Sequence, residues 1–210
     1  MNVQKHKGAT DPQSFDQIVR EVFAPIYPVI AQQIIQKSLL TQGKCLDAGC
    51  GTGALGRALA KATQMHIIFF DQSEKMLELS KKYVQNENLT NRSSFLNGDI
   101  HNIPYENESL DLVISRGSLP FWDDWAKAYG EIFRILKKGG QGYIGCGFGT
   151  EELRHKIMKT MKKNNPNWKA PVQDSFESKK ATLPQIIETL NPSTVELIDD
   201  KSGFWVYIKK

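Results

Sequence analysis

The segment Asp47-Ala48-Gly49-Cys50-Gly51-Thr52-Gly53 is the most informative part of this sequence. It follows the short apolar run Cys45-Leu46 and precedes apolar residues at helical spacing, namely Leu55, Leu59 and Ala62. Three glycines at alternate positions leave one side of the turn free of Cβ atoms, so a ligand can lie against backbone N–H groups where the helix begins. A strand, a glycine-rich turn and a helix in this order predict the ligand crevice of an open α/β sheet.

The segments on either side of this turn predict a sheet with helices on both faces. Five strand patterns separated by helical segments require parallel crossovers. Two further strand patterns end the chain as a hairpin, which adds antiparallel pairing. We therefore expect one α/β domain with a doubly wound, mostly parallel seven-stranded sheet and a C-terminal antiparallel hairpin strand. After the first strand, the expected strands are residues 66–70, 94–97, 110–115, 141–146, 195–198 and 204–208.

Proline and glycine residues predict where several helices begin and end. Thr10-Asp11-Pro12 opens a first helix with a capping side chain, and Pro25 and Pro28 end it and begin a second. A later helix is expected to end at Lys137-Lys138, whose charges suit its negative end. Gly139-Gly140 would then supply the left-handed cap.

Composition and charge exclude several classes of protein. The chain has 210 residues, of which 40% are hydrophobic and 24% charged, as in an ordinary folded domain. Its net charge of +4 comes from scattered lysine pairs, which a solvated surface explains better than a nucleic-acid groove. Three cysteines without a Cys-x-x-Cys spacing argue against a zinc site or a disulfide framework. Without a long apolar run or a secretory signal, we expect a cytoplasmic protein that engages neither membrane nor nucleic acid.

Four more sequence features follow the glycine turn in a consistent order and spacing along the chain. Asp71 closes the second strand, Gly98-Asp99-Ile100 closes the third, residues 110–116 form the fourth, and residues 136–140 precede the fifth. Together with the acid-x-Gly-x-Gly-x-Gly pattern of residues 47–53, these features resemble the class I S-adenosylmethionine-dependent methyltransferases of small molecules. The resemblance covers about residues 14–210. It implies a Rossmann-like methyltransferase fold and S-adenosyl-L-methionine as the cofactor.

The resemblance also implies roles for individual residues. Asp71 would accept hydrogen bonds from both ribose hydroxyls, and Asp99 would bind the adenine amino group. Gln72 and Met76 would border the adenine, although packing in the core explains Met76 equally well. No metal site is expected. The implied cofactor-binding residues are Asp47, Gly49, Gly51, Gly53, Asp71, Gln72, Met76, Asp99, Ile100 and Arg116.

Three residues are candidates for the acceptor side, although the sequence identifies no catalytic residue. Arg116 and Trp122 lie just past the carboxyl end of the fourth strand, where the transferred methyl group would project. Tyr27 resembles the N-terminal aromatic residue that many small-molecule methyltransferases fold over the methionine end of the cofactor. Core packing explains Tyr27 equally well, and Trp122 can instead hold the helix that follows it.

The resemblance divides this single methyltransferase domain into four parts. Residues 164–180 are expected to be a polar connection, anchored by Trp168 and Phe176, that closes over a bound acceptor together with the segment around Tyr27. The four parts are an N-terminal helical extension or lid (1–42), a cofactor-binding core (43–150), a helical insertion or lid (151–192) and the terminal β-hairpin (193–210).

The expected function is transfer of a methyl group to a small-molecule acceptor by in-line displacement, in a monomer or a homodimer. Methylation of RNA or protein, and non-catalytic binding of S-adenosylmethionine, are alternatives. Residues 51–56 also fit the Gly-x-Gly-x-x-Gly pattern of dinucleotide-binding proteins. Asp47 has no role in that pattern, and a chain of this length leaves little room for the substrate domain of a dehydrogenase.

Overall fold

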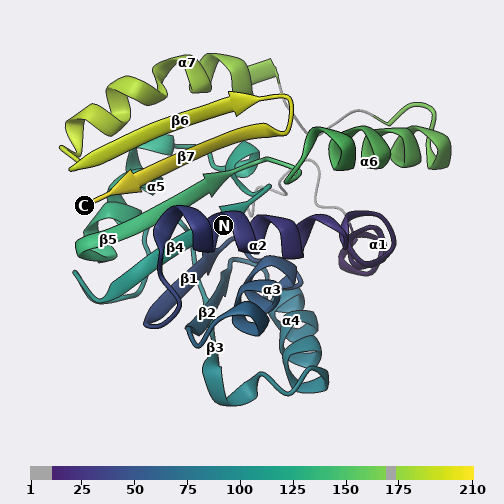
Figure 1. Cartoon of the computed structure of the whole chain (residues 1–210), viewed down its shortest axis with the longest axis horizontal. Helices are drawn as coiled ribbons and strands as arrows, with labels where there is room; N and C mark the ends of the chain where they lie inside the picture. The colour runs from purple at the N-terminus through teal and green to yellow at the C-terminus, as the bar shows by residue number, and fades with distance from the viewer. Residues whose placement is uncertain (1–10, 169–173) are drawn as a thin grey trace, which may run out of the picture.

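A seven-stranded sheet forms the centre of the protein in a computed structural model, which describes residues 11–168 and 174–210. The strands lie in the order β3-β2-β1-β4-β5-β7-β6. The first five pair in parallel, and β7 runs antiparallel to both β5 and β6 (Figure 1). This arrangement confirms the predicted fold class. The strands are β1 (Lys44–Ala48), β2 (His66–Asp71), β3 (Ser93–Asn97), β4 (Leu110–Arg116), β5 (Leu136–Gly145), β6 (Thr194–Asp200) and β7 (Gly203–Lys209).

Helices cover both faces of the sheet. Apolar side chains of α2, α3 and α4 form one core with one face of the strands, and those of α5 and α7 form a second core with the other face. Side chains along β7 alternate between the two cores: Phe204, Val206 and Ile208 enter the core with α5 and α7, whereas Trp205 and Tyr207 enter the core with α2, α3 and α4. Because both faces of the strand carry apolar side chains, both faces of the sheet must be covered by helices. The helices are α1 (Pro12–Ile18), α2 (Ile26–Ser38), α3 (Ala54–Ala62), α4 (Glu74–Asn86), α5 (Trp125–Ile135), α6 (Glu151–Asn164) and α7 (Asp174–Thr189).

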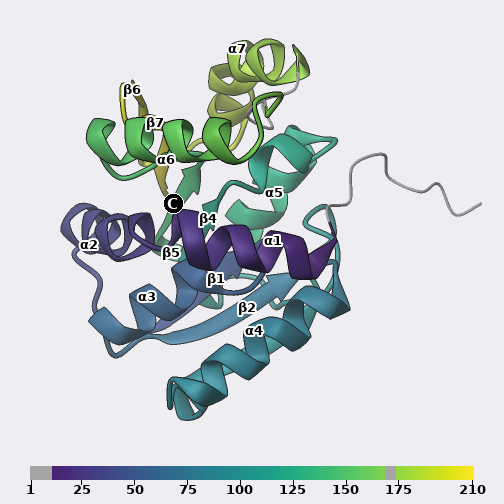
Figure 2. The same ribbon diagram turned by 90° about the vertical axis from the view of Figure 1, so that its right-hand side faces the viewer.

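Three short helical segments complete the fold. A π-helical segment, η1 (Val19–Phe23), continues α1, and two 3₁₀ segments, η2 (Thr90–Arg92) and η3 (Leu119–Phe121), precede β3 and α5. Figure 2 looks onto the end of the sheet where the parallel strands terminate. There α1 lies across the carboxyl ends of the central strands, and α6 lies beside it (Figure 2). The N-terminal segment is therefore placed over the crevice that the glycine turn predicts.

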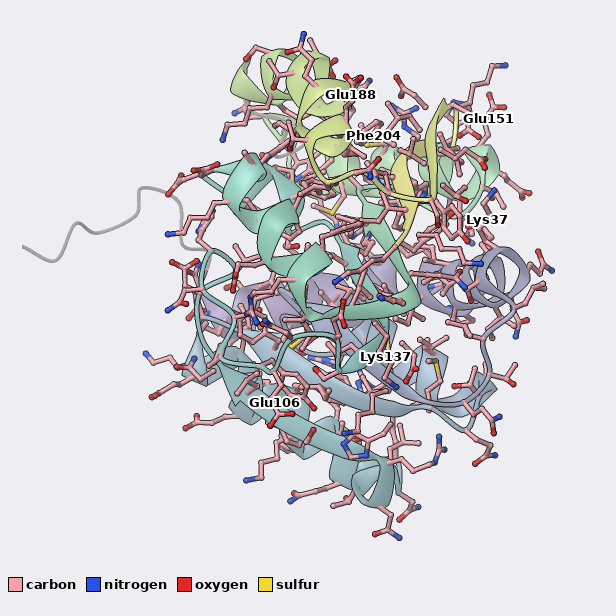
Figure 3. All side chains as sticks on the ribbon, turned by 90° about the vertical axis from the view of Figure 1, so that its left-hand side faces the viewer. Lys37, Glu106, Lys137, Glu151, Glu188 and Phe204 are labelled. Carbon is pink, nitrogen blue, oxygen red and sulfur yellow. The ribbon has the colours of Figure 1, made fainter. Side chains whose placement is uncertain are left out.

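Two predicted boundaries are wrong. Lys137 and Lys138 are not in the last turn of a helix, because α5 ends at Ile135 and β5 begins at Leu136. The Lys137 ammonium instead binds Asp111 at 2.7 Å, at the end of the sheet away from the crevice (Figure 3). Gly139 does have the expected left-handed φ of 77°, but inside β5, whose pairing with β4 shifts register nearby.

The second error concerns residues 164–180, which the sequence predicts to be an irregular connection. Helix α7 begins at Asp174, and Phe176 at 5% exposure is buried on the sheet. The Phe176 ring meets Trp125 and Phe204 edge-on, at centroid distances of 5.5 and 6.0 Å. The apolar anchor predicted at Phe176 is therefore present, but it attaches a helix to one face of the sheet. Residues 169–173 of the predicted connection lie outside the described residues.

No single helix in residues 11–168 and 174–210 is both long and apolar enough to cross a membrane. The segments Pro12–Phe23 and Ile26–Ser38 reach that length and composition only as a pair bent by 74°.

Candidate functional site

The glycine turn joins β1 to α3 in a conformation that suits glycine. Gly49, Gly51 and Gly53 have φ values of 66°, 53° and 77°, a region that residues with a side chain rarely adopt. The N–H groups of Gly49 and Cys50 both donate to the Phe70 carbonyl, at 2.8 and 3.0 Å, so the neighbouring strand β2 holds the turn. A Cβ on Gly49 would lie 2.5 Å from Ser118 Cβ, and one on Gly53 would collide with Ser80. The residues at these two positions must therefore be glycines for the chain to pack.

Asp71 lies directly beside this turn, as the sequence predicts. One carboxylate oxygen accepts from the Gly51 N–H at 2.8 Å and the other from the Ser73 N–H at 2.9 Å. Burial raises the pKa of Asp71, and these two hydrogen bonds oppose the rise. A carboxylate has about four lone-pair sites, so Asp71 can still accept two hydroxyl donors from a ligand. The loop and the acid are thus brought together before any ligand binds.

Asp47 lies on the buried side of the turn. It is 2% exposed, and its carboxylate accepts from the Gly56 N–H in the first turn of α3 at 2.9 Å. Burial raises its pKa to about 7, against the effect of the hydrogen bond from Gly56. Nearby Asp71 raises it further, and Arg57 lowers it. In this arrangement Asp47 fixes the start of α3 relative to β1.

The residues expected around the adenine follow β2 and β3, which are neighbours in the sheet. Gln72 is exposed and Met76 half-buried, while Ile100 is 8% exposed and packs into the α5 core. Asp99 is exposed; its carboxylate accepts from the His101 N–H at 2.9 Å and contacts His101 Nδ1 at 2.7 Å. Because His101 Nε2 accepts from the Asp124 N–H, the proton lies on Nδ1 in the neutral ring and is donated to Asp99.

The side chain of Asp99 is therefore held in one direction. Burial raises its pKa, but the hydrogen bonds from His101 outweigh burial and hold the pKa of Asp99 below its usual range. Of the residues that the sequence indicated here, Gln72, Met76, Asp99 and Ile100 follow the carboxyl ends of the neighbouring strands β2 and β3. Their role towards adenine remains a prediction.

On the other side of the turn, Arg116 ends β4 and meets two aromatic rings. Its guanidinium carbon lies 4.8 Å from the Phe23 ring centroid and 5.1 Å from that of Phe148, and its Nε donates to the Gly147 carbonyl at 3.1 Å. Burial raises the pKa of the neighbouring Tyr27 phenol, while the charge of Arg116 and a hydrogen bond from it act in the opposite direction. Arg116 and Tyr27, two of the candidates for the acceptor side, thus lie next to each other; their role towards an acceptor remains a prediction.

Trp122 lies apart from this pair. Its side chain is 4% exposed and belongs to the apolar core on the α5 face, where its ring meets Tyr129 edge-on at 6.2 Å. The 3₁₀ segment η3 turns the chain so that Phe121, at 55% exposure, faces outward and Trp122 inward. This position matches the packing alternative for Trp122 rather than contact with a substrate.

Sequence reasoning also did not single out two residues of α1, Phe15 and Asp16. A Cβ on Gly51 would lie 3.3 Å from the Phe15 ring, so Phe15 covers the glycine turn. The adjacent Asp16 accepts from the Tyr83 hydroxyl of α4 at 2.7 Å and pairs with Arg20 at 2.9 Å. Helical spacing marks Phe15 only as a core residue, and no local pattern indicates the contact between α1 and α4.

Comparisons with known proteins agree with this geometry. The methyltransferase domain family matches residues 46–144. A protein from Methanococcus maripaludis, assigned as an S-adenosyl-L-methionine-dependent methyltransferase, has a crystal structure that superposes with a TM-score of 0.87 and 41% identity. The superposition covers 95% of this chain and 91% of that one. The chain belongs to the class I S-adenosylmethionine-dependent methyltransferases. S-adenosyl-L-methionine is therefore its cofactor.

More distant members of the methyltransferase family match this chain either over its whole fold or over part of its length. A SAM-dependent methyltransferase from Aquifex aeolicus superposes over 95% of this chain and 98% of its own, with a TM-score of 0.71 and 16% identity. The sterol 24-C-methyltransferase of Aspergillus fumigatus is 30% identical over 120 residues. That match spans 55% of this chain and 32% of the fungal enzyme, so this chain covers about a third of its curated relative.

The glycine turn and Asp71 have the features that binding of S-adenosyl-L-methionine requires. Left-handed glycines, a carboxylate with free acceptor capacity and the start of a nine-residue helix, α3, meet at one point of the crevice. No group of three His, Cys, Asp or Glu side chains suited to hold a metal ion occurs in the part of the chain that the structure describes.

Proposed function

We propose that this protein transfers the methyl group of S-adenosyl-L-methionine to a small-molecule acceptor. The observation that carries the proposal is a group of aromatic residues at the carboxyl end of β4, where Phe23, Tyr27 and Phe148 all interact with the Arg116 side chain. These aromatic residues come from η1, α2 and the segment after β5. Aromatic side chains gathered from three elements would suit a small organic acceptor better than a folded RNA or a protein surface.

Names of relatives support the same class of acceptor. Matches at about 30% identity include sterol 24-C-methyltransferases from several fungi. A demethylmenaquinone methyltransferase from Lactobacillus johnsonii is 36% identical over 98 residues. Each of those names refers to a small-molecule substrate of that protein. These matches span about half of this chain and less than half of each relative, so the relatives support the class and not the identity of the acceptor.

The chain's own residues would act mainly by positioning. When bound, S-adenosylmethionine supplies an electrophilic methyl group on a sulfonium. Asp71 would accept from the ribose hydroxyls, and the glycine turn would leave room for the methionine end. Phe15 and α1 would cover the crevice and exclude water, while the aromatic side chains beside Arg116 would orient the acceptor. Orienting two reactants in this way can lower a barrier by about 7–11 kcal/mol.

Radiolabelled methyl transfer tests the proposal. The protein is incubated with S-adenosylmethionine that carries a labelled methyl group and with separate small-molecule, RNA and protein fractions of a cell extract. We expect label only in the small-molecule fraction, with equimolar release of S-adenosylhomocysteine. Asp71→Ala should abolish the transfer, whereas Arg154→Gln, which removes a hydrogen bond to the Lys201 carbonyl on the terminal hairpin, should not. Label in RNA or protein would refute the proposal, as would cofactor binding without transfer to any fraction.

A further inference from the structure

The side chain of Arg116 is held in one orientation. Two aromatic rings pack against its guanidinium group from the same side: the Phe23 and Phe148 centroids lie 4.8 and 5.1 Å from the guanidinium carbon, and the rings stack on each other with a centroid distance of 6.1 Å and an angle of 28°. The Nε–H is fixed by the Gly147 carbonyl at 3.1 Å. Beyond the Nε–H, the two Nη atoms carry four N–H donors in a plane, and the Tyr27 phenol beside them is one acceptor for these donors.

The charge of Arg116 has no anion to balance it. Among the side chains that the structure describes, no carboxylate forms an ion pair with Arg116. Of the other partly buried arginines, Arg57 pairs with Glu87, and Arg134 pairs with Glu131 at 2.7 Å. Arg92 and Arg154, like Arg116, have no carboxylate partner in the described part of the chain and donate to backbone carbonyls. A partly buried cation of this kind can take an anionic ligand, and of these three arginines Arg116 is the one at the carboxyl end of a central strand.

The position of Arg116 directs such a ligand to the acceptor side. Arg116 is the last residue of β4, which pairs with β1 immediately before the glycine turn. The Ser115 hydroxyl donates to the Ala48 carbonyl at 2.7 Å, and Ser118 packs against Gly49, so the two strand ends are joined. An anion bound at the edge of Arg116 would therefore lie beside the crevice, next to Tyr27.

We propose that Arg116 binds a carboxylate carried by the methyl acceptor, and that Phe23 and Phe148 receive the apolar part next to it. This inference rests on the proposed function. Guanidinium and carboxylate are both planar and form two parallel N–H···O bonds along their edges. The cofactor also contains a carboxylate on its methionine end, so the experiment must distinguish the two sources.

The first arm measures binding of benzoate and of neutral, similarly shaped benzamide to protein saturated with S-adenosylhomocysteine, by calorimetry. We expect the parent to prefer benzoate at least tenfold, and Arg116→Gln to reduce the preference below threefold. Arg154→Gln, the matched control, should keep the parental preference. Equal binding of the two probes by the parent, or a preference that survives Arg116→Gln, would overturn the proposal. Should Arg116→Gln fail to fold, a crystal structure of the parent with benzoate decides: the carboxylate lies on the Nη atoms of Arg116, or the proposal is wrong.

The second arm compares S-adenosylhomocysteine with 5′-methylthioadenosine, which lacks the amino-acid part. We expect Arg116→Gln to bind both nucleosides within threefold of the parent. A tenfold or greater loss for S-adenosylhomocysteine alone would assign Arg116 to the carboxylate of the cofactor and overturn the proposal, while leaving the proposed function intact. Failure of the parent to bind S-adenosylhomocysteine would instead refute the proposed function itself.

Discussion

Replacing Gly51 by alanine separates the role of the glycine turn in binding from its role in folding. A Cβ at Gly51 would meet the Phe15 ring at 3.3 Å, a contact that α1 can relieve by moving a few tenths of an ångström. The matched control is Gly139→Ala, because Gly139 also has a positive φ, 77° against 53°, but has no atom within 4 Å of its added Cβ. Gly139 lies in β5 beside Lys137, at the end of the sheet away from the crevice (Figure 3).

Backbone strain should be similar in the two variants. A residue with a Cβ in the left-handed region costs about 1–2 kcal/mol, partly offset by the lower entropy of the unfolded alanine chain. We therefore expect each variant to lose about 1 kcal/mol of unfolding free energy, or roughly 2–4 °C in Tm for a domain of this size. Only Gly51→Ala adds a methyl group to the space between the turn, Phe15 and the cofactor. Overpacking of that kind costs about 1–3 kcal/mol, which corresponds to about 5–150-fold in affinity.

Calorimetric titration with S-adenosylhomocysteine, together with thermal unfolding, checks both expectations. Gly51→Ala should fold and bind at least fivefold more weakly, while Gly139→Ala should match the parent in affinity and show a similar loss of Tm. Parental affinity in Gly51→Ala would mean that the turn does not face the ligand. Equal weakening in the two variants would mean that backbone strain alone explains the effect.

Three further perturbations follow from the geometry. Burial raises the Asp47 pKa from 3.8 to about 7 in the folded state. Between these two pH values the folded protein keeps the Asp47 proton and the unfolded chain has lost it, so the contribution of Asp47 to the unfolding free energy falls as the pH rises. Urea unfolding at pH 5 and 8 should show the parent losing about 2–3 kcal/mol of unfolding free energy relative to Asp47→Asn. A pH-independent difference between the two proteins would contradict the assignment. Tyr83→Phe removes the hydrogen bond to Asp16 that links α4 to α1. Proteolysis within α1 should therefore become several-fold faster, while the unfolding free energy changes by only about 1 kcal/mol. An unchanged rate of proteolysis would mean that this bond does not hold α1. Trp122→Ala should lower the unfolding free energy by about 3–5 kcal/mol because the side chain is buried against Tyr129. The folded fraction of this variant should bind S-adenosylhomocysteine with parental affinity. Parental stability together with weakened binding would instead indicate that Trp122 contacts the ligand.

The order of strands and helices could be predicted because each element has a local signature. The glycine turn, the acid at the end of β2 and the hairpin near Gly203 depend on residues close together in the chain. Adjacency of β1 and β2 in a parallel sheet then brings Asp71 to the turn without further information. This is why the meeting of Asp71 with Gly51 was predictable.

Features that depend on tertiary packing were not predictable. Phe23 and Phe148 are far apart in the sequence, and only the meeting of η1 with the segment after β5 brings both rings against Arg116. Polar residues before Phe176 suggest a loop, yet burial of that ring against Trp125 stabilises a helix from Asp174 onward. The helix propensity of a local sequence is weak evidence for secondary structure, because the stabilisation from a single buried contact can exceed it.

The central claim is that the cofactor lies between Asp71 and the glycine turn, beneath α1. A crystal structure with bound S-adenosylhomocysteine tests it most directly. The account predicts both ribose hydroxyls within hydrogen-bonding distance of the Asp71 carboxylate, the amino-acid end against Gly51 and the Phe15 ring over it. A nucleoside bound elsewhere, or one whose ribose is held by other side chains while Asp71 contacts only the Gly51 and Ser73 N–H groups, would contradict the account.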